Sequence, residues 1–158
     1  KSNVYNLLYK CSPKYIECIK HIIKNEGSNL IYSSFVNNEG LEIFKIYLTF
    51  FGIHLYNNNN TNSYIEYSGD ISQKQRSENI KIFNNINNID GKIIKILLIS
   101  SAGTEGINLL NVRNVHILEP FWNEIRIKQI VGRAIRECSH YNLPIEKRFV
   151  HIYRYSSI

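Results

Sequence analysis

The sequence contains no methionine, only three cysteines and no long apolar run. Its apolar stretches fall well short of the roughly 18 to 20 residues that a membrane-spanning helix needs, which excludes such a helix. No charged segment followed by an apolar segment and a cleavage site opens the chain, so no secretory leader is expected. Because the chain begins at Lys1 and lacks methionine altogether, we expect it to be a piece of a longer protein.

The three cysteines, Cys11, Cys18 and Cys138, are odd in number. Their spacing matches neither a disulfide framework nor a CxxC metal pair, so we expect reduced thiols in a soluble, intracellular protein. The histidines are scattered along the chain and give no metal-ligand spacing either. The sequence therefore predicts no metal site within this chain.

What the chain does contain is enough apolar sequence for one folded domain. Of its 158 residues 44% are hydrophobic and 20% are charged. A chain of roughly 150 residues can bury a core without disulfides or metal, which excludes disorder over most of its length. The 19 Lys and Arg residues outnumber the 13 Asp and Glu residues, giving a formal charge of +6. This excess is modest and only weakly indicates a polyanionic partner.

Segments with helical period alternate with short segments typical of strands. Helices are expected from Ser12 to Gly27, Glu39 to Phe51, Ser72 to Ile86 and Asn123 to Glu137. Strands are expected at Asn29–Phe35, Ser63–Tyr67, Ile93–Ile99, Val115–Leu118 and Phe149–Tyr153, with an exposed loop at Asn57–Asn60. This alternation predicts an α/β fold with a mostly parallel sheet and helices on both faces, over residues 12–158 after a linker at 1–11. Ligands of such folds bind at the carboxyl ends of the strands.

The most apolar strand runs into a loop with small and hydroxyl-bearing residues, Ser100 to Leu109 (SSAGTEGINL). Glycines let a backbone approach a phosphate closely, and a following helix start favours anions. The loop matches neither the GxGxxG dinucleotide signature nor the GxxxxGK[ST] phosphate loop. On these residues alone, a phosphate-binding loop and a plain connection between elements both stay open.

The helix expected from Asn123 has two different faces. One face gathers Ile127, Ile130, Val131, Ala134, Ile135 and Cys138, and the opposite face gathers Arg126, Gln129, Arg133 and Arg136. The apolar face belongs in the core. The arginine row is either a solvated face or a phosphate-binding site, since guanidinium groups bind phosphates through two parallel hydrogen bonds. Trp122 and Asn123 just before it are either a packed aromatic and a helix cap or functional residues.

Together these segments resemble the C-terminal RecA-like lobe of superfamily 2 helicases and translocases. SSAGTEGINL resembles motif V of that family, QIVGRAIR (Gln129 to Arg136) motif VI, and LIYSSF (Leu30 to Phe35) motif IV. The segment from Gly69 to Asn84 and the pair Trp122-Asn123 resemble elements of Swi/Snf-type remodellers, although Glu124 replaces the proline of their WNP element. The stretch from Leu118 to Arg148 is similar to ATPases of poxviruses and other large cytoplasmic DNA viruses, a group that includes nucleoside triphosphatase I and the ATPase subunit of the early transcription factor.

The resemblance implies a three-layer RecA-like lobe that completes an ATP site. Arg136 would be the arginine finger and Arg133 its companion on the terminal phosphate. The implied ATP-binding residues are Gln129, Gly106, Asn108 and Glu105, where Asn108 stands in place of the family's common aspartate. The nucleotide would be ATP with Mg²⁺, whose ligands belong to an N-terminal lobe that is absent from this fragment. The fragment alone is therefore expected to hydrolyse no ATP.

The resemblance also implies contacts with a nucleic-acid backbone. They would come from Ser34, Phe35, Ser100, Ser101, Trp122 and Asn123. DNA is the expected partner and RNA the alternative, together with the N-terminal lobe of the same chain and a viral RNA polymerase. The expected function is a motor in viral transcription, located in the virion and the host cytoplasm.

Other readings stay open. One is a strand-separating helicase, because the ATP chemistry of motif VI serves unwinding and translocation alike. Another is a non-catalytic nucleic-acid-binding module of the same fold, although the presence of Arg133 and Arg136 argues against it. A dinucleotide-binding enzyme would need a glycine fingerprint after the first strand, and residues 32–36 carry none.

Overall fold

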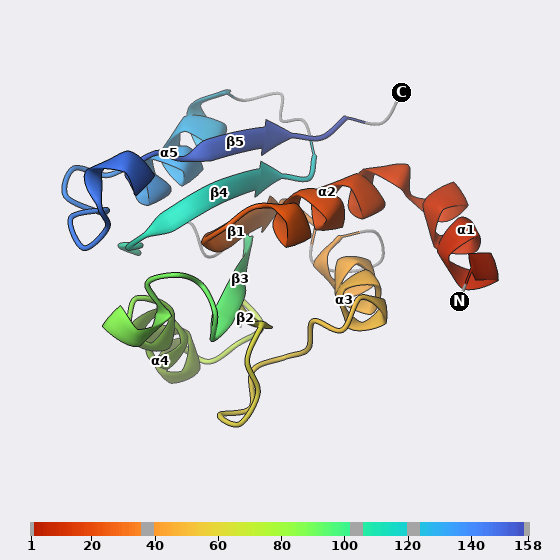
Figure 1. Cartoon of the computed structure of the whole chain (residues 1–158), viewed down its shortest axis with the longest axis horizontal. Coiled ribbons are helices and arrows are strands. Elements are labelled where there is room, and N and C mark those ends of the chain that lie inside the picture. Colours follow the sequence, from red (N-terminus) through yellow and green to blue (C-terminus); the bar gives the residue numbers. More distant parts are fainter. Residues whose placement is uncertain (1, 36–39, 102–105, 120–123, 157–158) are drawn as a thin grey trace.

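Five parallel strands form one sheet in the computed structural model, which describes residues 2–35, 40–101, 106–119 and 124–156 (Figure 1). The strands are β1 Ser28–Ser33, β2 Ser63–Tyr67, β3 Ile94–Ser100, β4 Val112–Ile117 and β5 His151–Arg154. Their order across the sheet is β2-β3-β1-β4-β5, and every neighbouring pair is parallel. This confirms the predicted α/β class.

Helices cover both faces of the sheet. They are α1 Ser2–Cys11, α2 Pro13–Lys24, α3 Leu41–Phe50, α4 Gln73–Phe83 and α5 Glu124–Ala134, with short 3-10 turns at Ile86–Asn88 and Ile145–Lys147. Helices α2 and α3 pack on one face, and α4 and α5 pack on the other. The chain thus has the three layers that the sequence predicted.

Alternate residues of the strands enter two separate cores. On β3, Ile96 and Leu98 pack with the side chains of α2 and α3. The intervening Leu97 and Ile99 pack with Phe83 of α4 and with the apolar face of α5. Strand β3 lies between two other strands and is almost wholly buried, as its near-continuous apolar sequence predicts.

Helix α1 is an element that the sequence analysis did not predict. Tyr47 of α3 donates a hydrogen bond from its Oη to the carbonyl of Leu8 at 3.0 Å. The ring of Tyr5 meets that of Phe51 edge to face, with centroids 6.4 Å apart. Because tertiary contacts of this kind stabilise short helices more than local propensity does, this ten-residue segment could not be predicted from its own sequence. The start of the domain at residue 12 stays a prediction.

Helix α5 ends three residues earlier than expected, at Ala134. Ser139 Oγ donates to the carbonyl of Ala134 at 3.3 Å, and the backbone N–H of Asn111 donates to the carbonyl of Ser139 at 2.8 Å. These bonds turn the chain away from the helix axis toward the start of β4. The placement of Ile135 and Cys138 in the core was therefore wrong, since both are exposed.

Smaller differences concern the other element ends. Strand β4 begins at Val112, three residues before the expected start, and α4 ends at Phe83 instead of Ile86. Within the described part of the chain, none of the helices has the length and apolar character to cross a membrane. The three cysteines carry free thiols.

Candidate functional site at the carboxyl edge of the sheet

Adjacent strands bring hydroxyl groups together at the carboxyl edge. Ser33 at the end of β1 lies opposite Ser100 at the end of β3 in the strand register. Ser33 Oγ donates to the carbonyl of Phe35 at 2.9 Å and so shapes the chain after β1. The Oγ of Ser100 is buried and has no hydrogen-bond partner among the described residues. Ser34 and Ser101 continue these two strand ends, and the ring of Phe35 is 56% exposed.

A carboxylate that sequence reasoning gave no role, Glu119, stands at the same edge. Its Oε2 accepts a hydrogen bond from the backbone N–H of Ser34 at 3.1 Å, which ties the end of β1 to the second residue after β4. Its Oε1 is buried and, within the described residues, has no partner. Burial raises the pKa of Glu119, while hydrogen bonds from Ser33 and Ser34 oppose that shift. Glu119 lies two residues after β4, which pairs with β1. A carboxylate at such a strand end is the sequence feature that could have pointed to it.

The segment after β3 is fixed from α4 by Asn84, a second residue without an assigned role. The Nδ2 of Asn84 donates to the carbonyl of Asn108, and its Oδ1 accepts from the N–H of Leu110, both at 2.8 Å. Ile107 and Leu109 are buried in the core. The alternating Gly106 and Asn108 face outward and are exposed. The two ATP-binding candidates described here thus stand on an anchored backbone.

Helix α5 contacts the same segment through Arg133. The Nη1 of Arg133 donates to the carbonyl of Ile107 at 3.3 Å, and its side chain is half-buried. Gln129 is exposed on α5, and Arg136 is exposed in the turn beyond the helix. The structure therefore joins Arg133 to the Gly106–Leu110 segment but does not place Arg136 on the helical row that the sequence predicted.

Three predicted site residues, Glu105, Trp122 and Asn123, lie outside the described residues. The site residues described above offer hydroxyl, amide and guanidinium donors and the carboxylate of Glu119, while Glu124 at the start of α5 is ion-paired with Arg154 at the end of β5. This set suits an anion such as a phosphate, whereas Mg²⁺ prefers several oxygen ligands. In the described part of the chain, no group of three or more His, Cys, Asp or Glu side chains is placed to hold a metal ion.

Comparison with known proteins identifies the family of the chain. Residues 14–138 match the family described as the helicase conserved C-terminal domain. The chain belongs to this family. Curated relatives of this helicase C-terminal domain include nucleoside triphosphatase I of Heliothis armigera entomopoxvirus, which is 41% identical over 96% of the chain. An Acanthamoeba polyphaga mimivirus protein with the provisional name ATP-dependent RNA helicase R350 is 39% identical over the whole chain. The chain spans 22% and 20% of the lengths of these two relatives.

Solved structures show the same fold. The C-terminal part of the Fun30 ATPase domain superposes with a TM-score of 0.67 at 23% identity, covering 89% of this chain and 39% of that one. The yeast DEAD-box splicing factor Prp28 superposes with a TM-score of 0.63 at 14% identity, covering 90% and 26%. The helicase C-terminal domain therefore has the RecA-like fold of superfamily 2 ATPases.

Proposed function

We propose that this domain is the second lobe of a viral, nucleic-acid-dependent ATPase and completes the ATP site of an N-terminal lobe of the same protein. The observation that carries the proposal is the hydrogen bond from Arg133 to the carbonyl of Ile107. It joins the arginine-bearing helix to the loop after β3, so that the two segments form one surface for an anion. The family and the names of its relatives support ATP as that anion.

In this proposal Arg136 is the arginine finger and Arg133 its companion on the terminal phosphate. An exposed guanidinium beyond the end of α5 is free to reach a nucleotide held by another lobe. Arginine fingers stabilise the charge that develops during phosphoryl transfer and contribute about 10³ to 10⁵ in rate. Gln129, Gly106, Asn108 and Glu105 make the remaining contacts of this lobe with ATP. The N-terminal lobe supplies the ligands of Mg²⁺.

The serine pairs at the carboxyl edge bind the nucleic-acid backbone in this proposal. Ser34, Phe35, Ser100 and Ser101 contribute, together with Trp122 and Asn123. Hydroxyl and backbone N–H donors position phosphates without reading bases, so binding is independent of sequence and weakens with salt. DNA is the partner we propose, within viral transcription, beside an RNA polymerase in the virion and host cytoplasm.

Steady-state ATP hydrolysis by the full-length protein tests the proposal. We expect DNA to stimulate the wild type, and Arg136→Ala to lower turnover by at least about 10³-fold while ATP still binds. Lys128→Ala removes another exposed cation from α5 and should keep turnover within about twofold. An unchanged rate in Arg136→Ala would refute the arginine finger and favour a non-catalytic binding module. The isolated domain should show no hydrolysis above background.

The second candidate is strand separation of RNA, which the name of the mimivirus relative favours. Translocation and unwinding use the same arginine chemistry, so Arg136→Ala cannot separate them. A strand-displacement assay with the full-length protein on RNA and DNA duplexes does separate them. Displacement of an RNA strand that depends on ATP would favour the helicase, and stimulation of hydrolysis by DNA without displacement would favour the translocase.

A further inference from the structure

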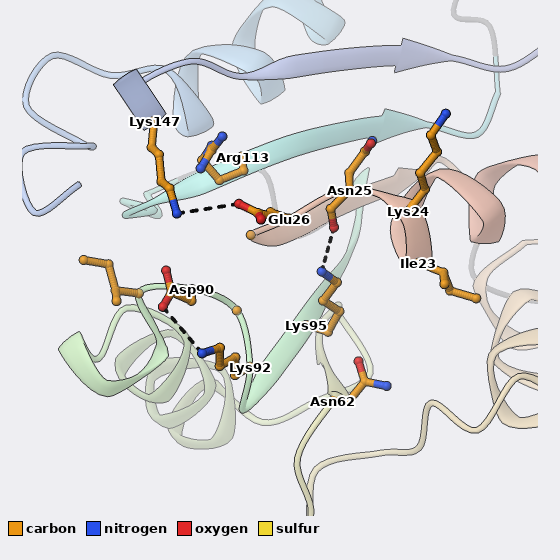
Figure 2. Close-up of a pocket in the computed structure, with 13 residues that line it drawn as sticks. Ile23, Lys24, Asn25, Glu26, Asn62, Asp90, Lys92, Lys95, Arg113 and Lys147 are labelled. Atoms are coloured by element: carbon orange, nitrogen blue, oxygen red, sulfur yellow. Dashed lines mark hydrogen bonds and ion pairs between the residues drawn. The ribbon is translucent and has the colours of Figure 1, made fainter. Parts of the chain in front are cut away.

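A cavity of about 470 Å³ opens at the opposite, amino-terminal edge of the sheet (Figure 2). Its walls come from the end of α2, the turns before β1 and β3, and the beginning of β4. None of the residues predicted for ATP or nucleic acid is among the residues that line this cavity. The volume is in the range of sites for small ligands.

Positive charge dominates the lining. Lys92, Lys95, Arg113 and Lys147 come from different segments, and Glu26 and Asp90 are the carboxylates among the lining residues. Lys24 also lines the cavity, but its ammonium group points away in Figure 2. Four cations against two carboxylates leave an excess of two positive charges. The ion pairs Lys147–Glu26 at 3.6 Å and Lys92–Asp90 at 4.0 Å are solvent-exposed and hence weak, so both lysines can turn to an anion.

Arg113 is the fixed donor of the cavity. Its side chain is only 6% exposed, its guanidinium carbon lies 4.4 Å from the centre of the Phe149 ring, and its Nε donates to the carbonyl of Phe149 at 3.3 Å. The aromatic face holds the guanidinium plane in one orientation. Within the described residues, the two terminal nitrogens of Arg113 have no hydrogen-bond partner, so this fork remains available for a phosphate.

Lys95 provides a second, partly buried donor. Its Nζ donates to the carbonyl of Asn25 at 2.9 Å, and burial lowers its pKa. A bound anion would offset this cost of burial. The walls are also held close together: a Cβ on Gly27 would lie 2.2 Å from the Cγ of Arg113, and one on Gly91 would lie 2.6 Å from the backbone nitrogen of Ser28. These two contacts show that the cavity is shaped by the packing of the fold.

We propose that the amino-edge cavity binds a compact, multiply charged phosphate group, with Arg113 and Lys95 as inner donors and Lys147 and Lys92 at the rim. The group belongs either to a free polyphosphate or to the end of a nucleic-acid strand. Both present the same chemistry to a guanidinium fork flanked by ammonium groups. The inference is independent of the proposed ATPase function, because the cavity is lined by none of the residues proposed for ATP or nucleic acid.

Titration of the ¹⁵N-labelled 158-residue chain with inorganic triphosphate, at about 50 mM salt where charge screening is weak, tests the proposal. We expect saturable amide shifts at Gly27, Gly91, Lys95 and Arg113. The double variant Lys95→Gln/Lys147→Gln should weaken binding at least about tenfold. The matched control, Lys74→Gln/Lys128→Gln, removes two exposed cations outside the cavity and should change affinity less than about twofold. Arg113→Gln is a further variant, with the amide spectrum reporting its fold.

The outcomes distinguish a free polyphosphate from the end of a nucleic-acid strand, and binding in the cavity from binding elsewhere on the domain. Competition between triphosphate and a 5′-phosphorylated single-stranded decanucleotide for the same amides identifies the end of a nucleic acid, whereas binding of triphosphate alone identifies a free polyphosphate. Absence of saturable shifts, shifts confined to residues 106–110 and Arg133, or equal losses in the two double variants would overturn the proposal. Hydrolysis by the full-length protein decides the proposed function separately.

Discussion

The two edges of the sheet are built in different ways. At the carboxyl edge, the carboxylate of Glu119 holds the chain after β1 through a hydrogen bond from the backbone N–H of Ser34. At the amino edge, glycines let neighbouring segments pack closely, as Gly27 does against the side chain of Arg113. The carboxyl edge thus relies on a polar bond, whereas the amino edge combines close glycine packing with polar bonds such as that from Lys95 to the carbonyl of Asn25.

This difference predicts which edge tolerates change. Hydrogen bonds to loop backbones each contribute about 1 kcal/mol and can be lost one at a time. A packed wall cannot accept an added methyl group without moving its neighbours. We therefore expect a lost hydrogen bond to act locally and an added methyl group at the amino edge to strain its neighbours.

The largest effect on stability should follow from a single methyl group at the amino edge. Gly27→Ala places a Cβ 2.2 Å from the Cγ and 2.6 Å from the Cβ of Arg113, at a φ of +85°. We expect the free energy of unfolding to fall by about 2 to 4 kcal/mol, from backbone strain of about 1 to 2 kcal/mol and overpacking of similar size. Urea unfolding of the 158-residue chain measures this loss.

Gly52→Ala is the matched control for that change. Gly52 has a similar φ of +81°, but no atom lies within 4 Å of an added Cβ. Only the backbone strain of about 1 to 2 kcal/mol should therefore appear. Equal losses in the free energy of unfolding of the two variants would mean that Arg113 moves aside without cost and that the packing around Gly27 is not tight.

The next largest effect concerns a histidine between the two edges. His116 on β4 is fully buried, and its Nε2 lies 3.0 Å from Oδ1 of Asn29. Since the amide nitrogen of Asn29 donates to two backbone carbonyls, its Oδ1 accepts and Nε2 of His116 carries the proton. The Nδ1 of His116 then accepts from the hydroxyl of Tyr155 at 2.9 Å, and the oxygen of Tyr155 accepts from Nδ1 of His21 at 2.8 Å.

Burial lowers the pKa of His116 to about 3 from its ordinary value of 6.5, and the charge of His21 adds to this effect. The unfolded chain therefore takes up a proton below pH 6.5 that the folded chain takes up only near pH 3. The free energy of unfolding therefore has its full value above pH 6.5. Below that pH it decreases, by up to about 1.4 kcal/mol per pH unit.

Denaturant unfolding at several pH values measures this slope. We expect His116→Gln to lower stability at pH 7 and to flatten the dependence between pH 6.5 and 4.5, a difference of about 2 to 3 kcal/mol over that interval. His54→Gln changes an exposed histidine and should keep the slope of the wild type. Parallel curves for wild type and His116→Gln would contradict the buried neutral imidazole.

The smallest effect is expected where the end of α4 meets the segment between β3 and β4. Asn84→Ala removes both hydrogen bonds to the segment at Asn108 and Leu110, and we expect a loss of about 1 to 2 kcal/mol in the free energy of unfolding. Asn87→Ala, at an exposed position nearby, should cost less than about 0.5 kcal/mol. Hydrogen exchange at Leu110 should quicken in Asn84→Ala alone. Protection that persists at Leu110 would show that the core holds this segment without Asn84.

Much of the fold could be predicted because the elements carry strong periodic signals. The apolar run at β3 and the spacing of Ile127, Ile130 and Val131 on α5 both report burial directly. The end of α5 could not be predicted, because Ser139 and Asn111, which turn the chain, interact only in the folded protein. Helix α1 could not be predicted for the same reason, because the residues that it contacts, Tyr47 and Phe51, are distant from it in the sequence.

Some residues of the candidate site could likewise be predicted from the sequence, and others could not. Its hydroxyls, glycines and arginines stand out in the sequence, whereas Glu119 and Asn84 do not, because their importance lies in the backbone groups that they reach. Sequence spacing alone determined which side chains point to one face of a strand or helix. Only the tertiary structure decided that β3, β1 and β4 are neighbours, and hence that Ser33 meets Ser100 and that Arg113 and Lys95 share a cavity. Periodicity encodes the direction of a side chain, but the pairing of distant strands depends on the packing of the whole chain.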